Sequence, residues 1–412
     1  FNGEIYNYLE LRKELEANGH KFETNTDTEV VLAAYRQWGH DCLHRFIGMW
    51  AFVLWDGSRF FISRDRLGKK PLYYFSDTSM GLLAMASEIK GFKGISGISL
   101  APDERTVYRY LSFAEIEGLG ETFFKGVREF PAGSYAYLTP GKTLEGITRF
   151  WTLSAESHDV SESEAVKEAS DLLFDSVRLR LRSDAPLGLS LSGGLDSTLL
   201  LALMNEAGVS RPVVFSSSYA EPGYNEKDYF RIATTRLSCE PMYAETDVDS
   251  FIRNFDCLIY HIEQPSKLPG PFSLWRVSNL ASRHVKVLID GQGPDEISGG
   301  YMYFLPSAFR GSPLAEKIRF LPDLALTMWA NRHILDQYPF TVILERVLGR
   351  TSSRRVVPVQ KKWAEGFRDE EPGWTKITDL NSMLHEAVTR SSLPGLLRYG
   401  DRVNMAFGIE NR

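Results

Sequence analysis

The chain has 412 residues, of which 47 are Lys or Arg and 53 are Asp or Glu, so its formal net charge is −6. This length predicts two or three domains, and the acidic balance argues against a protein that coats the phosphates of nucleic acid. The longest apolar runs fall far short of the ~20 residues that a membrane helix needs, so we expect no membrane partner. Three cysteines are too few for a disulfide framework, which indicates a reducing compartment and a cytoplasmic protein.

The first 150 residues combine short strands, turns and aromatic residues, a pattern typical of an antiparallel sheet with a few helices. Apolar residues at helical spacing, followed by Gly19, predict a helix from Asn7 to about Asn18, and a second helix is expected over Thr28–Trp38. The expected strands are Phe1–Tyr6, Met49–Asp56, Arg59–Arg64, Pro71–Ser76, Ser79–Ala86 and Gly133–Leu138. The sequence thus predicts an α+β domain over residues 1–153.

The character of the chain changes in a polar stretch, Ser154–Ser163, which we interpret as a linker to a second domain over residues 154–412. Ser161 or Ser163 can cap a long amphipathic helix that runs to about Arg182. Strands and helices then alternate, which predicts an α/β domain with a doubly wound parallel sheet. The expected elements are the strands Leu187–Leu191, Pro212–Ser218 and Val285–Asp290, the helices Ser197–Glu206, Glu226–Leu237, Val248–Tyr260 and Phe272–His284, and a mainly helical chain beyond Phe304.

A glycine-rich loop, Ser192-Gly-Gly-Leu-Asp-Ser197, lies between an apolar strand and an apolar helix. Its two glycines let a ligand approach the backbone closely, and the next helix offers free N–H groups and a positive dipole end to an anion. The loop is not a Walker A motif, because no Gly-Lys-Ser/Thr follows it. A capped Ser/Gly turn without a ligand is the structural alternative.

A second glycine-rich loop, Asp290-Gly-Gln-Gly-Pro-Asp-Glu-Ile-Ser-Gly-Gly-Tyr301, follows the strand Val285–Ile289. Since ligands bind at the carboxyl ends of parallel strands, both loops are expected at the same edge of the sheet. Asp196 and Asp295 could there bridge Mg²⁺ to phosphate oxygens, because this cation prefers oxygen ligands. A solvated acidic turn is the alternative.

These segments resemble enzymes that adenylate a carboxylate. Pro186–Ser197 is similar to the pyrophosphate loop of the ATP pyrophosphatases, which include the asparagine, GMP and argininosuccinate synthetases, and Asp290–Tyr301 and Leu393–Arg412 resemble segments of asparagine synthetases. The resemblance implies ATP and Mg²⁺ as cofactors, with Asp196 and Asp295 as metal ligands. The residues that it implies for ATP and pyrophosphate are Ser192, Gly193, Gly194, Leu195, Asp196, Ser197, Ser217, Asp290 and Gly291.

Four segments near the amino terminus resemble, in order, the class II glutamine amidotransferase domains: Phe1–Asn7, Thr26–Glu29, Ser63–Tyr74 and Ala86–Lys90. In that family an Asn-Gly pair forms the oxyanion hole, a role that carries over to Asn2 and Gly3. The chemistry fits, because a side-chain amide and a backbone N–H can both donate to a developing oxyanion. The family's acid that binds the α-amino group of glutamine carries over to Asp27. The resemblance implies an N-terminal-nucleophile-type glutaminase domain.

Three departures from the family pattern stand out. The nucleophilic cysteine of the family is the mature N-terminal residue, and none of Cys42, Cys239 and Cys257 matches its position. We therefore expect the sequence to be a fragment that lacks both true termini, including the family's catalytic lysine near the carboxyl terminus. Gln292 stands where many relatives carry Glu or Asp, and a glutamine cannot act as a base.

Taken over the whole chain, the resemblance implies a glutamine-hydrolysing asparagine synthetase. Such an enzyme converts aspartate, glutamine and ATP through β-aspartyl-AMP into asparagine, glutamate, AMP and pyrophosphate; its oligomeric state is open, with a homodimer among the possibilities. One alternative is a relative that closes β-lactams or cyclises peptides through an acyl-adenylate, but Asn2, Gly3 and Asp27 favour ammonia. Another alternative is a non-catalytic nucleotide-binding protein, but the presence of both Asp196 and Asp295 disfavours it.

Overall fold

The computed structural model describes residues 1–118, 120–142, 144, 146–154, 160–219, 227–266, 270–311, 322, 361–367, 370 and 379–412. The expected helix start at Glu226, part of the expected linker and most of the expected helical stretch after Gly311 lie outside these residues. We call residues 1–154 the N-terminal region and residues 160–412 the C-terminal region. Among the helices that the structure describes, none combines the length and the apolar character that crossing a membrane requires.

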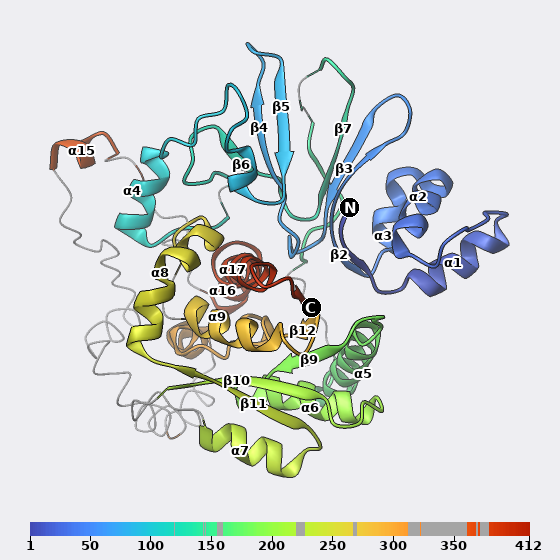
Figure 1. The fold of residues 1–412 in the computed structure, drawn as a ribbon, viewed down its shortest axis with the longest axis vertical. Helices are drawn as coiled ribbons and strands as arrows, with labels where there is room; N and C mark the ends of the chain where they lie inside the picture. Colours follow the sequence, from blue (N-terminus) through green and yellow to red (C-terminus); the bar gives the residue numbers. More distant parts are fainter. Residues whose placement is uncertain are drawn as a thin grey trace.

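The N-terminal region contains two antiparallel sheets (Figure 1). In spatial order the first consists of β1 (Asn2–Ile5), β2 (Gly48–Trp55), β3 (Phe60–Arg64), β7 (Ser134–Leu138) and β8 (Thr148–Arg149), and the second of β5 (Leu82–Ala86), β4 (Tyr73–Asp77) and β6 (Val127–Glu129). Successive side chains of β2 point to opposite faces of the first sheet, so both faces are packed. Trp50, Phe52 and Leu54 belong to one core cluster, and Ala51 belongs to another. β6 and β8, with three and two residues, are too short for the sequence pattern to reveal.

Helices cover the outer face of the first sheet and the end of the second. They are α1 (Tyr8–Ala17), α2 (Asp27–Trp38), η1 (Gly39–Asp41), α3 (Cys42–Arg45), η2 (Ile89–Phe92) and α4 (Glu104–Phe113). The side chain of Thr26 caps α2 by accepting from Glu29 N. The sequence analysis missed α4, although Asp103 caps it by accepting from Thr106 N at 2.9 Å.

The C-terminal region is built on a parallel sheet, as the sequence predicted. Its strands, in spatial order, are β11 (Glu240–Thr246), β10 (Val213–Tyr219), β9 (Leu187–Ser190), β12 (Val287–Ile289) and β13 (Glu410–Asn411). The sequence analysis missed both outer strands: β11 carries Pro241, which an edge strand tolerates, and β13 has only two residues. The strand order reverses at β9: the chain adds β10 and β11 on one side of β9, and then β12 and β13 on the other side.

Helices cover both faces of this sheet. The helices and helical turns that the structure describes in this region are α5 (Glu162–Arg180), α6 (Leu195–Glu206), α7 (Lys227–Arg236), α8 (Val248–Ile262), α9 (Gly270–Ala281), α10 (Pro294–Ser298), η3 (Met302–Phe304), α11 (Leu305–Gly311), α15 (Lys361–Glu365), α16 (Leu380–Glu386), η5 (Ala387–Ser391) and α17 (Leu393–Met405). Val177 of α5, Leu201 of α6 and Phe230 of α7 share a core cluster with one face of the sheet, and α9 packs on the other face. Ser161 caps α5 in a complete capping box with Glu164.

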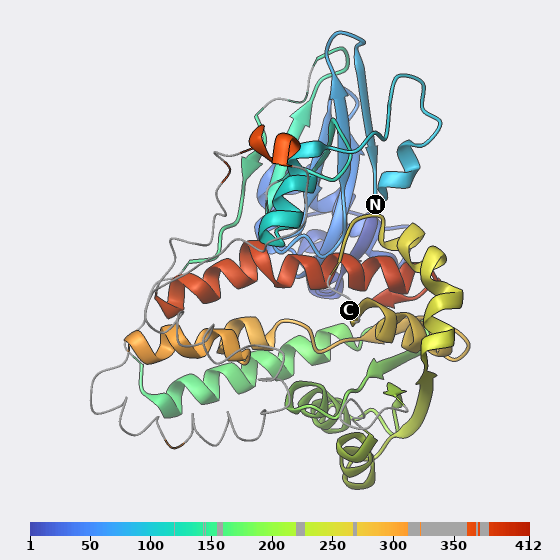
Figure 2. The same ribbon diagram turned by 90° about the vertical axis from the view of Figure 1, so that its left-hand side faces the viewer.

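Helix α17 lies between the two regions in both views (Figures 1 and 2). Its buried residues include three charged ones, Arg398, Asp401 and Arg402. Each has a partner in the N-terminal region: Arg398 donates to Glu117 at 2.8 Å, Asp401 accepts from Lys70 at 3.1 Å, and Arg402 lies 3.5 Å from Glu88. The interface between the regions therefore includes a buried set of paired charges.

The loop that presents Lys70 to α17 is held by its own charged residues. The carboxylate of Asp65 accepts from the backbone N–H groups of Trp50, Leu67, Lys69 and Lys70 at 3.0–3.2 Å. The guanidinium of Arg64 donates to the carbonyl groups of Gly68, Lys70 and Phe130. The segment Ser63–Tyr74 thus forms a rigid loop that fits against the C-terminal region.

Removing the buried Lys70 charge should destabilise the protein strongly. Both side chains of the Lys70–Asp401 pair are at most 4% exposed, so Lys70→Met leaves a buried carboxylate without its partner. We expect a loss of about 3–5 kcal/mol in the free energy of unfolding, measured by chemical denaturation. The exposed pair Arg178–Asp175 is the matched control, and Arg178→Met should cost about 0–1 kcal/mol. Equal losses in the two variants would contradict this role.

Candidate functional site

The loop after β9 is closed by serine hydroxyl groups. Ser192 and Ser197 share a hydrogen bond between their Oγ atoms at 3.0 Å, and Gly194 N donates to Ser192 Oγ at 3.1 Å. Gly193 has a φ of +88°, and a Cβ there would come within 2.5 Å of Phe230 N, so this position requires glycine. Leu195, by contrast, begins α6 with 85% of its surface exposed. The loop therefore ends on an open helix N-terminus.

The loop after β12 lies beside the first one. β12 is the direct neighbour of β9, and the strand order reverses at this pair, which is where doubly wound sheets bind ligands. The two loops approach closely, because a Cβ on Gly291 would lie 3.5 Å from Ser197 N. Ser217 lies at the same edge: β9 pairs Ser190 with Phe215, so Ser217 runs alongside the start of the first loop. The structure thus brings all the residues expected for ATP to one edge of the sheet.

Asp196 and Asp295 come from different loops, and the charge of Asp196 acts on Asp295. Burial raises the pKa of Asp295, and the negative charges of Asp196 and then Glu296 raise it further. Within the described part of the chain, no Lys, Arg or His side chain forms an ion pair with either Asp196 or Asp295. Adjacent carboxylates without a protein cation fit a bound divalent cation, which would neutralise both. Among the described residues, no group of three or more His, Cys, Asp or Glu side chains is placed to hold a metal ion.

Asp290 lies at the base of the second loop and is held from the N-terminal region. Lys69 Nζ donates to Asn411 Oδ1 at 2.7 Å, and Asn411 Nδ2 donates to Asp290 Oδ2 at 3.4 Å. Burial raises the pKa of the Asp290 carboxyl group, while the charge of Lys69 and a hydrogen bond with the Gln292 side chain act in the opposite direction. Burial also lowers the pKa of Lys69 to about 8. Gln292 therefore has a structural contact with Asp290, and the sequence analysis missed both Lys69 and Asn411.

The residues expected for an oxyanion hole lie on β1. This strand pairs with β2 so closely that a Cβ on Gly3, whose φ is +149°, would lie 2.1 Å from Met49 O. Asp27, at the start of α2, accepts from Ile5 N at 2.9 Å through its Oδ2 atom, which ties the helix to this strand. Burial raises the pKa of Asp27, and the hydrogen bonds from Ile5 and Thr28 oppose this shift. The structure thus brings Asn2, Gly3 and Asp27 together.

Glu4 joins this group from the same strand, and the sequence analysis did not single it out. Arg412 Nη2 lies 3.7 Å from Glu4, and Arg412 Nε lies 2.6 Å from Glu410. Burial, followed by the charge of Glu410, raises the pKa of Glu4 to about 7, against the opposing effect of Arg412. Only the tertiary structure could reveal this contact, because its partners lie at opposite ends of the chain.

A cysteine nucleophile is not supplied by the buried thiols of the described chain. Burial raises the pKa of Cys42 to about 12 and also raises the pKa of Cys239, so both remain protonated and unreactive at neutral pH. Cys257 is exposed on α8, a helix of the C-terminal region.

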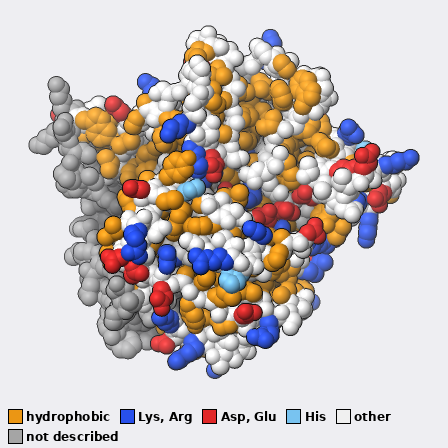
Figure 3. Space-filling model, viewed as in Figure 1, with side chains coloured by type: hydrophobic (Ala, Val, Ile, Leu, Met, Phe, Trp, Pro, Cys, Tyr) orange, Lys and Arg blue, Asp and Glu red, His pale blue; other side chains and the backbone are white. Residues whose placement is uncertain are grey.

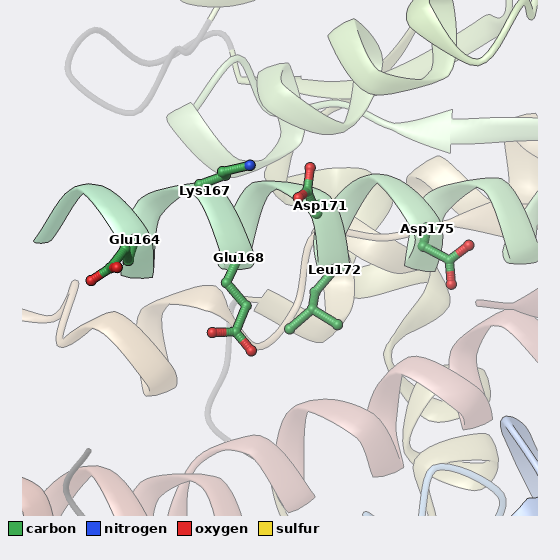
Figure 4. Close-up of a pocket in the computed structure, with 6 residues that line it drawn as sticks. All are labelled: Glu164, Lys167, Glu168, Asp171, Leu172 and Asp175. Carbon is green, nitrogen blue, oxygen red and sulfur yellow. The ribbon is translucent and has the colours of Figure 1, made fainter. Parts of the chain in front are cut away.

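A pocket elsewhere on the surface has none of these features. Figure 4 shows that its lining comes from one exposed helix, α5, through Glu164, Lys167, Glu168, Asp171, Leu172 and Asp175. On the face of the molecule in Figure 3, Lys and Arg side chains are interspersed with Asp and Glu side chains. Within the described part of the chain, the edge of the parallel sheet and strand β1 are the candidate sites.

The raised pKa of Glu4 predicts a pH-dependent stability. Between pH about 4.5 and about 7 the unfolded chain has already lost the Glu4 proton while the folded chain keeps it, so the free energy of unfolding should fall as the pH rises. Glu4→Gln cannot ionise and should gain stability relative to the wild type across this window, measured by thermal unfolding at several pH values. The exposed Glu16→Gln is the control. A Glu4→Gln difference that does not change with pH would contradict the shift.

Two family models match successive parts of the chain. A family model described as a glutamine amidotransferase domain matches residues 1–151, and one described as asparagine synthase matches residues 168–412. The chain is 33% identical over 303 residues to the glutamine-hydrolyzing asparagine synthetase 1 of Bacillus subtilis (strain 168), a match that covers 73% of this chain and 47% of that protein. Asparagine synthetase 3 of the same organism is 32% identical over 393 residues, which cover 86% of this chain and 61% of the relative.

A fungal relative matches over the whole chain. The protein named amidase chyE of Penicillium rubens is 31% identical over 469 residues, covering 100% of this chain and 67% of the relative. The chain spans about half the length of the first curated relatives that it matches. The asparagine synthase model covers more than half of the chain, and the matches include both regions. The chain therefore belongs to the asparagine synthase family, with an amidotransferase domain ahead of the synthase domain.

Proposed function

We propose that the full-length protein is a glutamine-dependent asparagine synthetase that uses ATP. The observation that carries this proposal is the meeting of two loops at the reversal of the parallel sheet, where the charge of Asp196 raises the pKa of Asp295. We assign residues 1–153 to an N-terminal-nucleophile-type glutaminase domain and residues 154–412 to the synthetase domain. The substrates would be aspartate, glutamine and ATP, and the three cysteines of the chain support a reducing, cytoplasmic compartment.

In the synthetase domain the first loop would hold the pyrophosphate portion of ATP. The hydroxyl groups of Ser192 and Ser197 and the free N–H groups at the start of α6 face the same edge, and such groups stabilise phosphate oxygens. Asp196 and Asp295 would hold Mg²⁺, which when bound neutralises charge on the phosphates. A carboxylate oxygen of aspartate would attack the α-phosphorus, and pyrophosphate would leave.

The resulting acyl-adenylate makes the carboxyl carbon electrophilic, because AMP is a far better leaving group than oxide. Ammonia would attack that carbon and AMP would leave, which gives the amide. Gln292 cannot accept the proton that ammonia releases, and its contact with Asp290 favours a role in holding the loop.

In the glutaminase domain Asn2 and Gly3 would bind the oxyanion that forms when a nucleophile attacks the glutamine side chain. The Asn2 amide and the Gly3 backbone N–H are donors of the kind that stabilise this charge. Asp27, whose carboxylate is fixed to β1 by Ile5, would accept from the α-amino group of glutamine. Glutamate and ammonia would be released, and the ammonia would pass to the synthetase domain.

Pyrophosphate release tests the proposal directly. With ATP and Mg²⁺, the full-length protein should release pyrophosphate when aspartate is the only carboxylate, and should form asparagine when glutamine or ammonia is added. Turnover with aspartate absent but with a carboxylate that carries its own amine would instead indicate a cyclising relative. Binding of ATP without any turnover would indicate a non-catalytic protein.

Replacing the proposed metal ligands should separate the two activities. We expect Asp196→Asn and Asp295→Asn each to lower aspartate-dependent pyrophosphate release at least about a hundredfold while sparing glutamine hydrolysis, because a lost ligand removes several kcal/mol of charge stabilisation. The exposed Asp171→Asn on α5 is the matched control and should retain both activities. Wild-type synthesis rates in either variant would contradict the metal assignment.

A further inference from the structure

The segment Ala86–Lys90 has no role in the proposed chemistry, although it is one of the segments that resemble the amidotransferases. It follows β5 in the N-terminal region, but the C-terminal region holds it in place. Ile89 N donates to Glu263 Oε2 at 3.1 Å, and Lys90 N donates to Glu263 Oε1 at 2.6 Å. A single carboxylate from the end of α8 thus binds two consecutive backbone groups of the other region.

Glu263, which accepts these two bonds, has an unfavourable backbone conformation. Its φ is +62°, which is uncommon for a residue other than glycine, and its side chain is only 4% exposed. Such strain persists only where surrounding contacts fix it, and it concentrates at functional sites. Here those contacts include Arg402 of α17, whose Nε lies 3.3 Å from Glu263 Oε2.

Arg402, which contacts Glu263, also contacts Ser87. Its guanidinium donates to the carbonyl oxygen of Ser87 and lies 3.5 Å from the Glu88 carboxylate. The side chain of Arg402 is 2% exposed, so water does not compete for these contacts. Arg402 therefore fixes the carbonyl group of Ser87, and Glu263 fixes the backbone two and three residues further along the same segment.

The hydroxyl group of Ser87 contacts the proposed oxyanion hole. Asn2 Nδ2 donates to Ser87 Oγ at 3.4 Å. A side-chain amide carries two N–H donors, so the bond to Ser87 uses one and fixes the direction of the other. An oxyanion donor is effective only when it is aimed before the charge develops, because reorientation during the reaction costs energy.

We propose that Ser87 is a positioning residue for the Asn2 amide, and that Arg402 and Glu263 hold Ser87 in place from the C-terminal region. This inference rests on the proposed glutaminase function. Through the segment Ala86–Lys90, contacts with the C-terminal region would determine how the Asn2 amide is oriented in the oxyanion hole. Glutamine hydrolysis then depends on the docking of α17, although α17 contributes no group to the reacting atoms.

Kinetics of glutamine hydrolysis by the full-length protein test the role of Ser87. Ser87→Ala should lower kcat about tenfold or more and leave the KM for glutamine unchanged, because the amide is misdirected only where charge develops. Ser87→Thr keeps the hydroxyl group and should restore most of the rate, and the exposed Ser96→Ala should behave as the wild type. Ammonia-dependent asparagine formation and the melting temperature of Ser87→Ala should not change. An unchanged kcat in Ser87→Ala would overturn the role of Ser87.

A double-variant cycle tests the contribution of Arg402. Arg402→Lys keeps the charge but shortens the reach to Ser87 O, so it should also lower the kcat of glutamine hydrolysis. If Arg402 acts through Ser87, Arg402→Lys should cause no further loss in the Ser87→Ala background. Additive losses would overturn the link from Arg402 to Ser87. A wild-type protein that cannot hydrolyse glutamine would contradict the proposed function, and this inference with it.

Discussion

The buried pairing of charges between α17 and the N-terminal region is the interaction on which the rest of the structure depends. A single buried charge is costly, and it is tolerated only with a well-placed partner of opposite sign. Lys70 and Asp401 each supply that partner from a different region, and neither could be buried alone. Because the loop of Lys70 is itself fixed by Asp65, the pair sets the position of one region against the other. Buried apolar contacts alone would specify this position less strictly, since they have no direction.

Both candidate sites depend on this interface. In the C-terminal region, Lys69 of the same loop reaches Asp290 through Asn411, so a residue of the N-terminal region holds the base of the loop after β12. In the N-terminal region, Arg402 of α17 holds Ser87, which contacts Asn2. Lys69 and Lys70 are neighbours in the chain, as are Asp401 and Arg402. Two adjacent pairs of residues thus serve both the docking of the regions and the geometry of the two candidate sites.

The parallel sheet explains why its loops meet although nearly a hundred residues separate them in the chain. The order β11-β10-β9-β12-β13 places the first strand of the sheet in the middle and sends the chain outward first on one side, then on the other. The loops after β9 and β12 therefore lie at the reversal, where no crossover helix separates them. Gly193 and Gly291 allow the close approaches there, the first to Phe230 and the second to Ser197. A side chain at Gly193 would push α7 away from the loop.

The sequence by itself determined the local features: the main helices and strands, the two glycine-rich loops, and the positions of Asn2, Gly3, Asp27, Asp196 and Asp295. These follow from periodicity, caps and loop composition, which act over a few residues. The short strands β6, β8 and β13 could not be predicted, because a strand of two or three residues has no recognisable alternation. Such strands form by pairing with the longer strands beside them. The roles of Lys69, Ser87, Glu263, Arg402 and Asn411 were decided only by the tertiary structure. Each is a polar residue whose partner lies between 85 and 342 positions away in the chain. The role of a buried charge or amide depends on that partner, which the neighbouring residues in the sequence do not reveal.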